Sequence, residues 1–180
     1  MFYENHTTNL LNDSIYLIVE KDFFEQVNAS QGILQKICNI YFYRNPYKED
    51  YHQEIIIRLW KAYPSFKSQS SFSTWLYKVA LNTAIDILRK QSIRPVHAEL
   101  TENEYSQPDD SYHLESENKD KLYWAIHHLT EIEKAIILLY LESYEYKEIS
   151  VIIGISESNI GVKINRIKNK LNKILTNGKE

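Results

Sequence analysis

Residues 129–171 read LTEIEKAIILLYLESYEYKEISVIIGISESNIGVKINRIKNKL and contain three segments with the apolar spacing of helices. Thr130, followed three residues later by Glu133, fits a capping box, in which each side chain bonds the other residue's backbone. The helix expected from there to about Glu142 contains the apolar run AIILLYL, so it should be buried on most sides.

A turn and two further helices follow in the same stretch. A short helix is expected at Tyr146–Ile153, where Gly154 can end it with a positive φ and Ser156 can cap the next helix. The last helix carries an apolar stripe at Ile160, Ile164, Ile167, Leu171 and Ile174. A polar stripe with the same spacing lies about 100° round the helix and comprises Asn159, Lys163, Arg166, Lys170 and Lys173. This arrangement is typical of a helix-turn-helix, whose second helix enters the DNA major groove; the alternative is a plain helical hairpin with a basic, solvated face.

Charge is distributed unevenly along the chain. Residues 95–120 hold eight acids and one lysine, net −7, whereas residues 158–179 hold six bases and no acid, net +6. The overall charge of −3 and the isoelectric point of about 6.1 hide this separation, so they do not exclude a nucleic-acid partner. The acidic stretch also contains Pro95 and Pro108 and has little periodicity, which predicts a linker.

The amino-terminal half is predicted to be a second helical block. Four glycines and four prolines in 180 residues favour long helices. Apolar spacing predicts helices at Lys48–Ala62 and from Phe72 to about Ile93, with a polar loop between them. The expected fold is all-α, with two small helical domains joined by a flexible acidic linker. The predicted divisions are an amino-terminal extension without a recognised motif at 1–19, a first domain at 20–94, the linker at 95–116 and the helix-turn-helix domain at 117–180.

Several classes of site are not expected. The glycines cannot be assembled into a phosphate-binding or dinucleotide-binding loop, and the six histidines show no HExxH motif. The lone cysteine, Cys38, excludes an intrachain disulfide and cysteine-rich zinc patterns. We therefore expect no catalytic residues, no metal and no cofactor. No secretory signal and no membrane-spanning run is found, so we expect a cytoplasmic protein without a membrane partner.

Two stretches together carry a family resemblance. Residues 50–90, DYHQEIIIRLWKAYPSFKSQSSFSTWLYKVALNTAIDILRK, resemble the second region of bacterial sigma factors, and residues 129–171 are similar to the fourth region. The order and spacing most resemble the small two-domain extracytoplasmic-function (ECF) group of the sigma-70 family. The resemblance implies binding to core RNA polymerase, through its β′ clamp helices and β flap, and to promoter DNA, with an anti-sigma factor as a further candidate partner.

The resemblance also implies roles for individual residues. The segment that docks on the β′ clamp helices matches Asp50, Gln53 and Glu54. The segments that hold a flipped base and border the −10 element match Gln69, Ser70, Ser71, Phe72, Trp75, Asn82, Arg89 and Lys90. The positions that bind the −35 element match Ser158, Asn159, Lys163, Arg166 and Lys170. This chain departs from the family at Gly161 and Val162, where many members have lysine and serine.

The implied function is that of a sigma factor, which binds core polymerase, reads and melts the −10 element with the first domain and binds the −35 element with the second. Two alternatives remain. One is a stand-alone helix-turn-helix transcriptional regulator, and the other is a sigma-like protein-interaction module that does not bind DNA.

Overall fold

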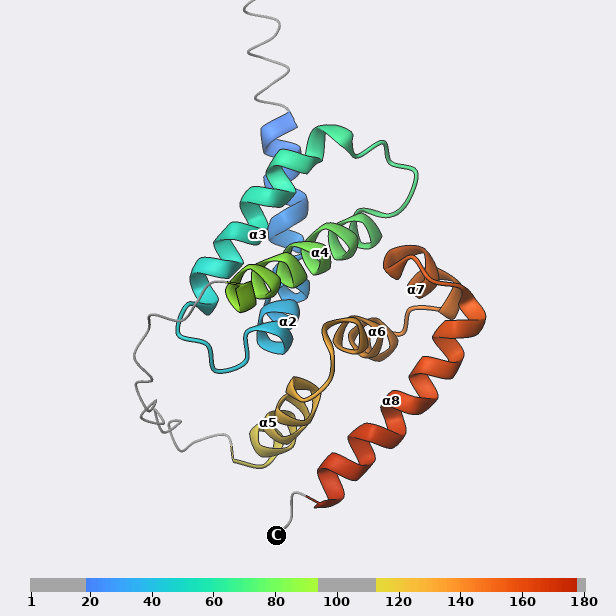
Figure 1. The fold of residues 1–180 in the computed structure, drawn as a ribbon. Helices are drawn as coiled ribbons and strands as arrows, with labels where there is room; N and C mark the ends of the chain where they lie inside the picture. The colour runs from blue at the N-terminus through green and yellow to red at the C-terminus, as the bar shows by residue number, and fades with distance from the viewer. Residues whose placement is uncertain (1–18, 94–112, 178–180) are drawn as a thin grey trace, which may run out of the picture.

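The scarcity of helix breakers has the expected result: all the secondary structure in the described residues is helical. The computed structural model describes residues 19–93 and 113–177, and these form two helical domains (Figure 1). The all-α prediction is thus confirmed for these residues. Residues 1–18 and most of the acidic linker predicted at 95–116 lie outside the described residues.

The first domain begins with a helix over residues 19–29. It continues through α2 (Gln31–Tyr41), α3 (Lys48–Ala62), the short 3-10 helix η1 (Tyr63–Ser65) and α4 (Phe72–Ile93). The bounds predicted for α3 and α4 are confirmed. Apolar side chains at helical spacing, including Leu34, Ile55 and Leu76, are fully buried and form the core.

The second domain contains α5 (His113–His127), α6 (Glu131–Leu141), α7 (Tyr146–Ile153) and α8 (Glu157–Asn177). The predicted capping box is confirmed: the Thr130 amide donates to Glu133 Oε2 at 2.9 Å, and the Glu133 amide donates to Thr130 Oγ1 at 3.4 Å. Gly154 ends α7 with φ of 81°, as its place in the turn predicted.

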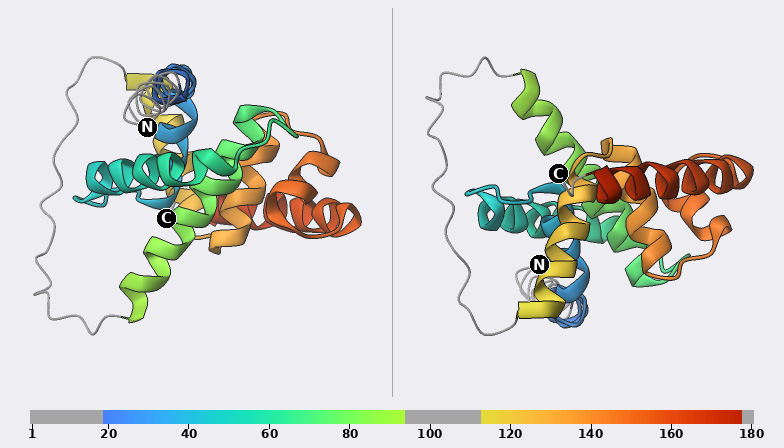
Figure 2. Two further views of the ribbon diagram at one scale, coloured as in Figure 1. Left: turned by 90° about the horizontal axis from the view of Figure 1, so that it is seen from above. Right: turned by 90° about the horizontal axis from the view of Figure 1, so that it is seen from below.

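The two domains contact each other, an arrangement that the sequence pattern did not predict. Helix α6 lies between the first domain and α8, with α2 and α8 both packed against it, while α7 contacts α4 (Figure 2). Lys36 Nζ lies 2.7 Å from Glu142 Oε2 across the interface, and the Tyr41 hydroxyl donates to the Glu131 carbonyl at 2.6 Å. The apolar surface of α6 is therefore covered from both domains.

Within residues 19–93 and 113–177, none of the helices combines the length and the apolar character that crossing a membrane would require.

The two glycines beside the turn provide a matched test of the fold. Gly161 lies inside α8, and a Cβ there would meet the Tyr146 ring at 3.5 Å, which is ordinary van der Waals contact. We expect Gly161→Ala to raise the free energy of unfolding by about 0.8–1 kcal/mol through helix propensity. Gly154→Ala should lower it by about 1–2 kcal/mol, because alanine is strained at positive φ even though nothing lies within 4 Å of its Cβ. Urea denaturation measures both changes, and shifts in the same direction would contradict this account.

Candidate functional site

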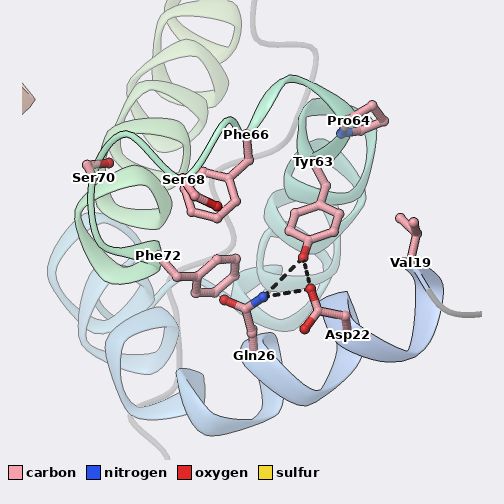
Figure 3. Close-up of a pocket in the computed structure, with 9 residues that line it drawn as sticks. All are labelled: Val19, Asp22, Gln26, Tyr63, Pro64, Phe66, Ser68, Ser70 and Phe72. Carbon is pink, nitrogen blue, oxygen red and sulfur yellow. Dashed lines mark hydrogen bonds between the residues drawn. The ribbon is translucent and has the colours of Figure 1, made fainter.

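A cavity of about 480 Å³ lies beside the loop that joins η1 to α4 (Figure 3). The residues that line it are Val19, Asp22, Gln26, Tyr63, Pro64, Phe66, Ser68, Ser70 and Phe72. Two of these, Ser70 and Phe72, were predicted from the resemblance to hold a flipped base. Aromatic walls with a few polar groups suit a planar ring that offers hydrogen bonds at its edge.

Three side chains form a polar network at one end of the cavity. Gln26 Nε2 donates to Asp22 Oδ2 and to the Tyr63 hydroxyl, each at 3.0 Å, and the Tyr63 hydroxyl donates to Asp22 Oδ2 (Figure 3). Burial, followed by the hydrogen bond to the Asp22 carboxylate, raises the pKa of Tyr63 to about 12, so its hydroxyl stays protonated near neutral pH. The donors of the network therefore bond other members of the network. Sequence reasoning missed Asp22 because it lies 41 residues from Tyr63.

An aromatic cluster supports the cavity wall. The Trp75 ring centroid lies 5.2 Å from that of Phe66, 5.4 Å from that of Phe72 and 6.0 Å from that of Tyr63. Trp75 is half-buried among these rings, so it is part of the packing and also reaches the surface. Both ends of the loop are therefore anchored by aromatic contacts.

The loop between these anchors presents polar side chains. Gln69, Ser70 and Ser71 are exposed. Ser71 has a local role, because its Oγ accepts from the Thr74 amide at 3.2 Å and so caps the start of α4. Gln69 and Ser70 are left as the side chains at the tip of the loop.

One face of α4 continues from this cluster. Trp75, Asn82 and Arg89 follow one another at intervals of seven residues, so they lie along one stripe of the helix. Asn82 and Arg89 are exposed, and Lys90 is exposed about 100° round the helix from Arg89. The structure therefore places the predicted −10 residues on one connected surface, with the loop at one end and the basic residues at the other.

The predicted polymerase-docking residues lie on α3. Asp50 and Gln53 are exposed, whereas Glu54 is half-buried and lies 3.6 Å from Arg58 Nη2. Ile57 shares this face and is 51% exposed, which sequence reasoning missed. The signal was present in three consecutive isoleucines, because residues 100° apart on a helix cannot all face one core.

Two basic side chains of α8 are engaged inside the second domain, Lys170 from the polar stripe and Lys168 from outside it. Lys170 Nζ lies 2.9 Å from Glu133 Oε2, and Lys168 Nζ donates to the Tyr140 hydroxyl at 2.7 Å. Although burial by itself would raise the pKa of Glu133, the bonds from Thr130 and Lys170 outweigh it and lower that pKa. The interaction with Glu133 therefore ties Lys170 to α6.

The remaining predicted −35 residues lie nearer the start of α8. Ser158, Asn159 and Arg166 are exposed, and Lys163 is half-exposed. Val162 and Asn165 are also exposed, on the side of α8 opposite its buried stripe. Sequence reasoning did not include these two residues, because it selected the charged stripe rather than the face directly opposite the core.

The chemistry of these surfaces is that of binding. Among residues 19–93 and 113–177, no group of three or more histidine, cysteine, aspartate or glutamate side chains is placed to hold a metal ion. The surfaces comprise a cavity with aromatic walls beside a polar loop, an acidic helix face and a basic helix that follows a glycine turn.

Comparisons with known proteins agree with this arrangement. The family model for sigma-70 region 2 matches residues 27–93, and the family model for sigma-70 region 4 matches residues 119–171. The ECF RNA polymerase sigma-E factor of Haemophilus influenzae is 28% identical over 172 residues, which cover 87% of this chain and 90% of that protein. The ECF RNA polymerase sigma-E factor of Escherichia coli K12 is 32% identical over 132 residues, covering 66% of this chain and 69% of that protein.

A solved structure shares the fold. The sigma factor RpoE, in complex with the anti-sigma factor NepR from Bartonella quintana, superposes with a TM-score of 0.65 at 19% identity, covering 87% of this chain and 98% of that chain. Two regions in the same order, on helical domains of this kind, and relatives matched over most of their length establish the family. This chain belongs to the ECF group of the sigma-70 family of sigma factors, the non-enzymatic proteins that direct transcription initiation at promoters.

Proposed function

We propose that this chain divides the work of a sigma factor between its two domains. The first domain binds core RNA polymerase and the −10 element of the promoter, and the second binds the −35 element. The observation that carries this proposal is the surface in which the cavity, the aromatic cluster and the polar face of α4 are continuous. A regulator that only recognised duplex DNA would have no use for a cavity with aromatic walls beside a polar loop.

Core polymerase docks on the exposed face of α3. Asp50 and Gln53 supply an acidic and an amide contact there, with Glu54 beside them. Carboxylates on a docking face suit basic residues on the partner and give the encounter its orientation. Ile57 supplies apolar area within the same patch, which supports a protein partner rather than DNA for this face.

The loop and cavity hold a base that has left the −10 duplex. The base stacks beside Phe72, while Gln69 and Ser70 bond its exposed edge from the loop; Trp75 lies next to the site of strand separation. Asn82, Arg89 and Lys90 contact the adjoining DNA from α4. Stacking is tolerant of sequence, whereas edge contacts discriminate, so both features belong in a −10 reader.

The second domain binds the −35 element through the start of α8. Ser158, Asn159, Lys163 and Arg166 lie at the positions where such a helix meets bases and phosphates. Lys170 contributes its charge from farther away while paired with Glu133.

Other parts of the function follow from the same proposal. The chain has no catalytic activity of its own, because polymerase carries out the chemistry, and it acts in the cytoplasm. An anti-sigma factor is a candidate regulator, because such a partner is named for the Bartonella quintana relative.

Run-off transcription with purified core polymerase tests the proposed function. We expect promoter-specific transcripts only when this protein is added, because core polymerase alone does not select a start site. DNA binding at a defined operator without core polymerase would favour a stand-alone regulator. Binding to core polymerase without transcripts or promoter binding would favour a protein-interaction module.

Reversing the acidic charge on α3 tests the docking face. Asp50→Lys with Glu54→Lys should weaken binding to core polymerase by about 100-fold or more, since like charges placed together cost several kcal/mol. Fluorescence anisotropy with labelled protein measures the dissociation constant. Glu25→Lys with Asp120→Lys is the matched control, because it changes the net charge by the same amount at two exposed residues that lie on other helices. Equal losses in the two proteins would mean that binding depends on total charge rather than on this face.

Removing the polar side chains at the loop tip tests the −10 site. Gln69→Ala with Ser70→Ala should reduce open-complex formation about tenfold, since each hydrogen bond lost from the base edge is worth about 0.5–1.5 kcal/mol. Permanganate reactivity of unpaired thymines measures opening, and binding to duplex DNA should stay within about twofold. Gln35→Ala, an exposed glutamine on α2, is the control and should leave opening unchanged. An equal loss of duplex binding would place the loop in duplex recognition rather than in strand opening.

A further inference from the structure

The outward face of α8 differs chemically from its charged flank. Ile160, Ile164 and Ile167 are fully buried and fix which side of α8 faces the domain core. The face directly opposite carries Ser158, Val162, Asn165 and Asn169, all of them exposed. None of these four side chains is charged, and Val162 is 49% exposed although it is apolar.

The basic residues Lys163, Arg166 and Lys170 lie together on one side of this uncharged line, and Lys168 lies on the other. Lys163 and Lys170 are half-buried, and Lys170 pairs with Glu133 of α6. Arg166 lies about 100° round the helix from Asn165. A helix that enters the major groove with its outward face forward would present serine, valine and asparagine to the bases, with its cations toward the phosphates on the groove walls.

The side chains on the line select particular bases. An asparagine amide pairs with adenine N6 and N7, and an apolar side chain contacts the thymine C5-methyl group. Guanine is recognised most often by a bidentate arginine or lysine, and the centre of this face has neither. A hydroxyl such as that of Ser158 can hydrogen-bond to several of the bases and so does not select one of them.

We infer that the DNA element read by α8 is rich in A·T pairs, with a thymine methyl against Val162 and an adenine opposite Asn165. The two residues are three positions apart, about 4.5 Å along the helix, so the two bases lie one or two base pairs apart. This inference rests on the proposed binding of α8 to the −35 element and adds the base class that it prefers.

The test uses holoenzyme assembled from core polymerase and the full chain, with a promoter library randomised over the −35 region and a fixed −10 element. Sequences recovered by binding and by run-off transcription should be enriched in A·T pairs at neighbouring positions. Base analogues then probe the two contacts without altering the protein. Uracil in place of the selected thymine removes one methyl group and should weaken binding about fourfold. Replacing the selected adenine by 7-deazaadenine should weaken it about tenfold.

Protein variants assign each effect to its residue. The uracil effect should shrink in Val162→Ala, which removes the two Cγ methyl groups, and the 7-deazaadenine effect should disappear in Asn165→Ala, which removes the amide. Asn165→Arg should shift the preferred base at its position from adenine to guanine. Asn172→Ala is the matched control: Asn172 is exposed on the same helix two turns farther on, and both analogue effects should persist in that variant.

The outcomes separate this inference from the function on which it rests. Specific initiation from a G·C-rich element, or insensitivity to both analogues, would overturn the inference and leave the sigma-factor function standing. Binding that selects no sequence at all would contradict −35 recognition by this domain, and the inference with it.

Discussion

The burial of α6 is the constraint on which the arrangement of the two domains depends. From Lys134 to Leu139 every residue of this helix is buried, so its apolar surface extends round most of its circumference. A helix of this kind cannot be covered from one side. Helices α7 and α8 cover part of it, and α2 of the first domain covers more. The contact between the domains follows from the composition of one eleven-residue helix.

Polar contacts at the two ends of α6 fix how the first domain sits on it. The Glu131 carbonyl, at the first residue, accepts from Tyr41, and Glu142, just past the last residue, pairs with Lys36. The ion pair contributes little energy, because it is partly exposed to water. The positions of the two contacts define the orientation, while the apolar burial between them supplies most of the stabilisation. The same helix holds Lys170 through Glu133, so α6 also determines which cations of α8 remain available for a partner.

The sequence correctly predicted those features of the helices that depend on neighbouring residues. The bounds of α3 and α4, the capping box at Thr130 and the positive φ of Gly154 all depend on residues within a few positions of one another. Features built from distant residues were missed. The cavity requires Asp22 to meet Tyr63, and no periodicity in either helix indicates that they are neighbours. Ile57 and Val162 were missed for another reason: their spacing places both off the buried stripe, but sequence reasoning selected charged and polar residues rather than exposed apolar ones.

By itself, the sequence determined that the chain is helical, where several of its helices begin and end, and to which family it belongs. These properties depend on the spacing of apolar residues and on capping residues. Both are local features of the chain and can be identified before any tertiary contact is known. Only the tertiary structure decided which lysines of α8 are engaged within the domain, that Asp22 meets Tyr63 beside the cavity, and that the two domains meet across α6. Those properties depend on contacts between residues far apart in sequence, and such contacts exist only once the apolar faces have been buried against one another.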